Sequence, residues 1–193
     1  MRLGRLIARL IIGGLFFGHG AQKLFGWFGG PGPEGTEAMM DKLDMHPPHE
    51  QALLASWAET AGGAMLALGF LTPLSAAALT GSMITAIRKV HLPNGLWAMN
   101  QGYEYNLALI ATLAALLDGG PGKPSLDSAL GIDCTGPGWT LASLAAGALG
   151  STVAIEVGGR IADETHSQES RDQAAAANTA CLLYTSPSPR DRS

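Results

Sequence analysis

Residues 52–71, ALLASWAETAGGAMLALGFL, are twenty residues that carry a single charge, Glu59. A helix that crosses the hydrocarbon core of a bilayer needs about 20 mostly apolar residues. An ionisable side chain inside such a helix costs roughly 2.5–3.5 kcal/mol on insertion scales, so it is retained for a function or for pairing with another helix. The stretch therefore predicts a transmembrane helix, and it makes Glu59 the first candidate for a functional residue.

Four other stretches are apolar over most of their length and predict further spans. They are 3–28, 74–92, a stretch that begins between Trp97 and Tyr103 and ends at Leu117, and the Ala- and Gly-rich 139–157. Pro73 separates the spans on either side of it, since proline ends helices and restricts the residue before it. We expect an all-α integral membrane protein in which four spans form a bundle and a fifth follows at the C-terminal side.

Composition agrees with a membrane protein and excludes several other classes. Of the 193 residues, 47% are hydrophobic and 15% are charged, whereas soluble proteins average about 25% charged residues. The net charge of -4 supplies no basic patch for nucleic acid, so we expect no nucleic-acid partner. Of the 2 cysteines, one is Cys134 and the other lies in the segment 181–193, so dithiol redox chemistry is not expected.

The chain divides into four segments by composition. We expect a four-span domain over 1–131, a loop and the fifth span over 132–160, a disordered polar tail over 161–180, and a foreign segment over 181–193. The last segment, CLLYTSPSPRDRS, resembles a transposon-end sequencing adapter translated in frame, and such segments are set aside when a fold is predicted.

Charges near the first span predict its orientation. Arg2, Arg5 and Arg9 place the N-terminus in the cytoplasm by the positive-inside rule, in a multi-pass protein of the plasma membrane. Arg88 and Lys89 then lie near the outer end of the third span, against that rule. Either the orientation is reversed, or these two residues serve the bundle itself.

Polar side chains from four segments are predicted to meet in the outer half of the bundle, because consecutive spans alternate in direction. The candidate ligand-binding or proton-handling residues are His19, Lys23, Glu59, Arg88, His91 and Glu104. Residues three or four apart share a helix face, which joins His19 to Lys23 and Arg88 to His91. Imidazoles titrate near neutral pH and suit proton handling. Lys23 is the expected partner of Glu59, and Arg88 is the second choice.

Other interpretations of these residues remain open. The charges can pair only to hold helices together, since buried ion pairs can specify helix register without adding stability. Imidazoles and carboxylates are also metal ligands, but Lys23 and Arg88 would repel a cation, so no metal site is predicted. The small residues Gly14 and Gly18, four apart in the first span, predict close helix packing there.

Short motifs along residues 5–131 resemble the DoxX family of small bacterial and archaeal membrane proteins. These motifs are His19-Gly20, Lys23-Leu24-Phe25-Gly26, Glu59 with Gly62-Gly63, Leu68-Gly69, Thr72-Pro73, Tyr103-Glu104-Tyr105, Gly120-Pro121-Gly122-Lys123 and Ser125-Leu126-Asp127. The resemblance implies a four-helix transmembrane bundle in the cytoplasmic membrane. Relatives are linked to thiosulfate:quinone oxidoreduction and to membrane complexes that handle oxidative and sulfur stress.

Two functions of different classes follow from the resemblance and the polar residues. In the first, the chain is the membrane subunit of a redox complex that binds quinone or a small sulfur anion. Lys23 and Arg88 then serve as anion partners, while Glu59, Glu104 and the histidines move protons. In the second, it is a non-catalytic membrane scaffold that recruits soluble oxidative-stress or sulfur-metabolism enzymes. No residue is assigned a catalytic role.

Overall fold

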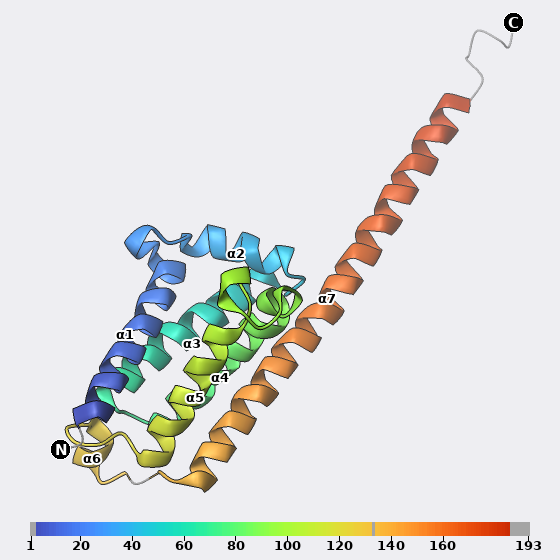
Figure 1. The fold of residues 1–193 in the computed structure, drawn as a ribbon. Helices are drawn as coiled ribbons and strands as arrows, with labels where there is room; N and C mark the ends of the chain where they lie inside the picture. The colour runs from blue at the N-terminus through green and yellow to red at the C-terminus, as the bar shows by residue number, and fades with distance from the viewer. Residues whose placement is uncertain (1–2, 133, 186–193) are drawn as a thin grey trace, which may run out of the picture.

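The computed structural model describes residues 3–132 and 134–185, with side chains to residue 177. Its helices are α1 (Leu3–Phe25), α2 (Gly32–Lys42), α3 (Pro48–Leu68), α4 (Thr72–Ala86), α5 (Glu104–Gly119), α6 (Leu126–Leu130) and α7 (Pro137–Thr185). Short 3-10 turns lie at Trp27–Gly29, Leu92–Asn94 and Ala98–Asn100, and a π-helical turn spans Ile87–His91. The described residues form helices and no strand, which confirms the all-α prediction (Figure 1).

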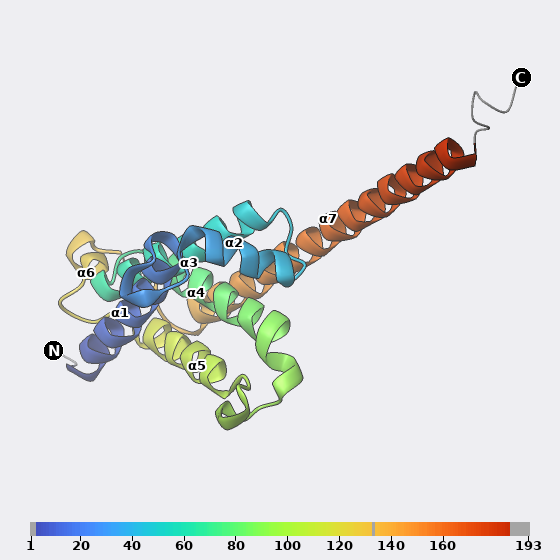
Figure 2. The same cartoon turned by 90° about the horizontal axis from the view of Figure 1, so that it is seen from above.

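Helices α1, α3, α4 and α5 pack side by side, and α7 lies along α4 before it runs far past the other helices (Figures 1 and 2). All four of the packed helices contribute to one buried apolar core. Its members are Phe16, Leu66, Leu79, Met83, Leu109, Leu113 and Leu116. Helix α2 lies across the end of α1 and α3 and contacts both. The chain direction alternates, so α2 and the C-terminal half of α7 lie at the same end of the molecule.

Two of the described helices are long and apolar enough to cross a membrane, namely α1 and the 137–177 part of α7. Helix α5 has 16 residues, fewer than the roughly 20 that a straight crossing needs, whereas α4, with 15, continues directly into the π-helical turn that ends at His91. Large apolar side chains nevertheless point outward from every long helix. Examples are Leu10, Leu54, Leu74, Leu107 and Leu141.

Helix α2 lies in residues 29–50, which connect the predicted spans 3–28 and 52–71. Pro33 stands in its first turn, where a missing N–H costs nothing, and Glu34 follows, where a negative charge favours a helix N-terminus. The Gly/Pro run after α1 therefore both ends that helix and begins α2.

The segment 161–180, predicted to be a disordered tail, is part of α7. Between Gly159 and Pro187 the chain holds no glycine or proline, and four consecutive alanines begin at residue 174. Such a composition propagates a helix that is already nucleated upstream. The adapter-like segment 181–193 lies at and beyond the end of α7, and residues 186–193 are outside the described residues.

Helices α1 and α3 approach each other through glycines. A Cβ placed on Gly13 would lie 2.6 Å from the backbone nitrogen of Ala67, and one on Gly63 would lie 2.6 Å from the carbonyl oxygen of Gly13. By contrast, Gly14 and Gly18 have no heavy atom within 4 Å of a Cβ built there. The prediction of close packing through these two was wrong, since the contact uses the neighbouring face of α1.

We expect Gly63→Leu to lower the thermal stability of the purified protein in detergent, because the side chain would collide with the α1 backbone. Overpacking of this kind costs about 1–3 kcal/mol or more. Gly14→Leu is the matched control, because it adds the same side chain and the same gain in helix propensity in open space. Equal melting temperatures for the two variants would contradict the packing.

Candidate functional site

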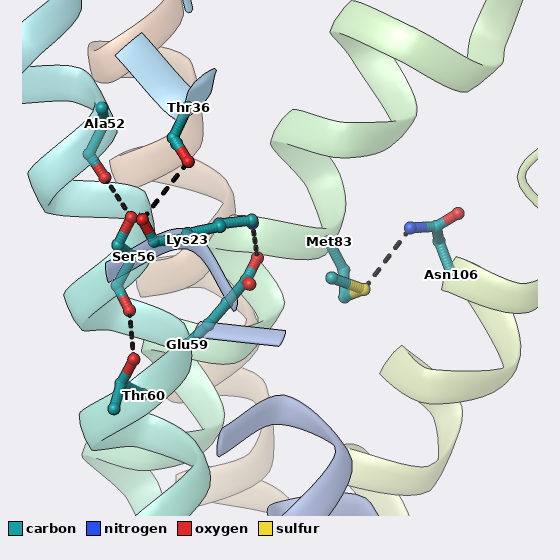
Figure 3. Close-up of polar contacts among 8 residues, drawn as sticks. All are labelled: Lys23, Thr36, Ala52, Ser56, Glu59, Thr60, Met83 and Asn106. Carbon is teal, nitrogen blue, oxygen red and sulfur yellow. Dashed lines mark hydrogen bonds and ion pairs between the residues drawn. The ribbon is translucent and has the colours of Figure 1, made fainter. Parts of the chain in front are cut away.

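Glu59 and Lys23 form an ion pair between α3 and α1, with Nζ 2.6 Å from Oε1 (Figure 3). Glu59 is 5% exposed. The pairing agrees with the partner that the sequence predicts for this carboxylate. The second carboxylate oxygen, Oε2, is buried and has no hydrogen-bond partner among the described residues. An unsatisfied buried acceptor is costly, so this oxygen is open to a donor from outside the chain.

The hydroxyl groups nearest in sequence to Glu59 are hydrogen-bonded to the α3 backbone and not to its carboxylate. Ser56 and Thr60, on the same helix, donate back to the carbonyls of Ala52 and Ser56 at 2.6 and 2.8 Å and are not available to Glu59 (Figure 3). Lys23 lies in the last turn of α1, where a cation is favoured by the helix dipole. The position of the ion pair is thus fixed by α1, which carries Lys23, and by α3, which carries Glu59.

The ion pair lies in the wall of a cavity of about 220 Å³, which we call the polar cavity. Four of the six candidate residues line it, namely His19, Lys23, Glu59 and His91. The rest of its wall comes from Leu15, Phe16, Met83, Ala86, Tyr105, Asn106 and Leu109. The cavity therefore joins residues of α1, α3, α4, α5 and the π-helical turn.

His91 has a defined hydrogen bond at the edge of the polar cavity. Its Nδ1 lies 2.7 Å from the carbonyl oxygen of Gln101, which can only accept, so Nδ1 carries the proton. In the neutral ring Nε2 is then an acceptor. Asn106 and Met83 also line the cavity, and Asn106 donates from Nδ2 to the sulfur of Met83 at 3.4 Å (Figure 3).

The three basic side chains of the π-helical turn have different surroundings. His91 reaches the polar cavity, Lys89 lines a second cavity, and Arg88 donates to the Thr152 hydroxyl of α7 at 3.1 Å. A π turn changes the angular spacing of successive side chains and often occurs at functional sites. Arg88 is therefore not part of the polar cavity, contrary to the single six-residue cavity that the sequence predicts.

Glu104 is the other candidate residue that lies elsewhere. Its Oε2 accepts from the backbone N–H of Ala98 at 2.9 Å, and the side chain is exposed. It stabilises the loop between the π-helical turn and α5. Sequence spacing could not show this, because the loop folds back to bring residue 98 to the start of α5.

The second cavity, about 450 Å³, is mainly apolar, and we call it the apolar cavity. It lies between α2, α3, α4 and α7, and its apolar wall includes Met39, Met40, Leu43, Met45, Leu54, Ala78 and Ala146. Lys23 and Glu59 line this cavity as well as the polar one. The ion pair thus stands between the two.

Sequence reasoning missed a buried polar cluster at the opposite end of the helices. Arg9, 2% exposed, donates to the carbonyl oxygens of Ala67, Pro121 and Pro124 at 3.1, 2.7 and 2.6 Å. Arg9 therefore joins α1 to the end of α3 and to the loop after α5. The motif around Gly120 and Pro121 that carries the DoxX resemblance was the available clue.

Asp127 completes that cluster. Its carboxylate, also 2% exposed, accepts from the N–H groups of Leu71 and Thr72 at 2.8 and 3.0 Å, and from the Thr72 hydroxyl at 2.6 Å. It therefore caps the N-terminus of α4 from a distant part of the chain. Within residues 3–132 and 134–185, no group of three or more His, Cys, Asp and Glu is placed to hold a metal ion.

Comparison with known proteins adds one finding. Residues 4–92 match the family described as DoxX, which agrees with the resemblance seen in the sequence. The matched segment includes Arg9, His19, Lys23, Glu59 and His91, so the ion pair and most of the polar cavity lie within it. No curated protein and no solved structure matches the chain.

Proposed function

We propose that this chain, whose residues 4–92 belong to the DoxX family of membrane proteins, is the membrane subunit of a redox complex that binds quinone in the polar cavity. In this proposal α1, α3, α4 and α5 form the transmembrane bundle, α7 crosses as a fifth span, and the N-terminus is cytoplasmic. The outward-facing apolar side chains and the two helices of spanning length support a bilayer location.

The observation that carries the proposal is the free Oε2 of Glu59. A buried carboxylate with one oxygen paired to Lys23 and the other unpaired suits a ligand that donates a hydrogen bond. A quinol offers hydroxyl donors, and His91 Nε2 supplies a second acceptor in the same wall. A quinone, when bound, supplies the acceptor for electrons and protons.

The chain's own groups would hold and move protons there. Glu59 is paired with Lys23, and the imidazoles of His19 and His91, which line the same wall, are the groups that would pass protons. A small sulfur anion is the weaker ligand, because the cation it needs, Lys23, is already engaged by Glu59. Arg88, the other predicted anion partner, bonds to α7 instead.

Quinone retention tests this proposal. The protein is purified in mild detergent from cells that make ubiquinone or menaquinone, and extracted quinone is measured per mole of protein. We expect wild type to retain quinone, held as the quinol, and Glu59→Gln and His91→Phe to retain at least severalfold less. The first variant puts an amide N–H donor in place of the free acceptor Oε2, and the second removes the imidazole of His91. Glu104→Gln is the control, because Glu104 lies outside the cavity. Absence of quinone from wild type, or equal retention by Glu59→Gln, would overturn the proposal.

A specific feature also favours the scaffold function. Residues 163–173 of α7 are all polar and mostly exposed, and this end of α7 extends past the other helices (Figure 1). If the chain recruits soluble enzymes, deletion of 163–177 should abolish their co-purification while quinone retention stays unchanged. Unchanged co-purification in the deletion variant would count against recruitment through this segment.

A further inference from the structure

We infer that the apolar cavity is a binding site for a single-chain amphiphile with an anionic head, of the fatty-acid class. The chain would lie between α2, α3, α4 and α7, with its head at Lys89. This site is separate from the polar cavity, and it does not rest on the proposed quinone function.

The wall of the apolar cavity fits a flexible hydrocarbon chain. Its volume of about 450 Å³ falls within the roughly 300–1,000 Å³ typical of small-molecule sites. Met39, Met40 and Met45 lie on one side, and methionine adapts to irregular apolar shapes. Gly150 of α7 leaves room on the other side, since a Cβ built there meets no atom within 4 Å. The cavity therefore offers apolar contact and few hydrogen bonds.

The lining of the cavity extends along the helices. On α4 and the π-helical turn it runs from Leu74 to Val90. These residues are sixteen apart, which corresponds to about 24 Å at the helical rise of about 1.5 Å per residue. An extended single chain matches this shape better than a compact ring.

The charge of the residues that line the apolar cavity favours a ligand with an anionic head group. Three charged side chains line the apolar cavity, and two of them, Lys23 and Glu59, neutralise each other. Lys89 has no carboxylate partner among the residues that the structure describes, so one positive charge remains uncompensated in the lining. A lysine at an apolar cavity attracts a carboxylate through a charge-assisted hydrogen bond.

Binding of palmitate to the full-length protein in detergent micelles tests the inference, with hexadecanol as the neutral probe of the same chain length. We expect saturable palmitate binding that weakens about tenfold in Lys89→Gln, as for the loss of one charge-assisted hydrogen bond. The matched control, Lys42→Gln, removes an exposed lysine that does not line the cavity and should bind as wild type does. Hexadecanol should bind more weakly and be insensitive to Lys89→Gln.

A second pair of variants tests the location of the chain. A Cβ on Gly150 or on Gly159 meets no atom within 4 Å, and only Gly150 lines the cavity. Gly150→Phe should therefore weaken binding of both probes, while Gly159→Phe should not. Wild-type palmitate affinity in Lys89→Gln or in Gly150→Phe would overturn the inference. Quinone retention, measured without added palmitate, is expected to be unchanged in Lys89→Gln, because Lys89 does not line the polar cavity.

Discussion

Lys23→Met alone is expected to lower the free energy of unfolding by about 3 kcal/mol, because it leaves the buried Glu59 carboxylate without its cation. Removal of one partner of a buried pair typically costs about 3–5 kcal/mol, and the partial exposure of Lys23 places the effect at the lower end. Thermal unfolding of the purified protein in detergent measures the loss. Lys42→Met, on the exposed surface of α2, is the control and should unfold like wild type.

The double variant Lys23→Met with Glu59→Leu separates the two roles of the pair. Replacing both charges with apolar side chains of similar volume removes the unpaired charge, so most of the lost stability should return. If the polar cavity binds quinone, the double variant should still lose quinone, since the free Oε2 is gone. A double variant that keeps both stability and quinone would show that the pair serves only to join α1 and α3.

Arg9→Met is expected to be as damaging, by about 3 kcal/mol or more. It removes three hydrogen bonds and leaves the carbonyls of Ala67, Pro121 and Pro124 without this donor. It also removes a cation close to the buried Asp127 carboxylate. The melting temperature in detergent and the rate of proteolysis between 120 and 125 should both report the loss.

Arg5→Met provides the matched comparison for Arg9→Met. Arg5 lies one turn earlier on α1 and donates one bond, to the carbonyl oxygen of Gly120 at 3.1 Å. Its replacement should cost about 1 kcal/mol, in line with one hydrogen bond. If the two variants lose the same stability, the three-carbonyl contact of Arg9 is not what holds this end of the helices.

The positions of the helices and the central ion pair could be predicted from the sequence because both depend on simple patterns. Apolar runs in the sequence predicted α1, α3, α4 and α5. Lys23 was predicted to pair with Glu59 because the two residues lie at a similar depth in spans that alternate in direction. A charge inside an apolar run needs a partner at the same depth, and few residues satisfy that condition.

The surroundings of Arg88 and Arg9 could not be predicted, because they depend on backbone geometry and long-range contacts, which the periodicity of the sequence does not show. Arg88 and His91 share a face in an ideal α-helix, but they lie in a π-helical turn, which separates them. Arg9 was interpreted through the positive-inside rule, yet its guanidinium reaches carbonyls more than fifty residues away. Those acceptors come together only when the loop after α5 folds onto the turn between α3 and α4.

The ion pair that stands between the two cavities has a thermodynamic consequence. A ligand that strengthens or weakens the contact of Lys23 with Glu59 from one side changes the shape and charge of the wall on the other side. By linkage, the occupant of the second cavity must then alter the affinity of the first by the same factor. Two ligands that never touch would be coupled through a single 2.6 Å contact.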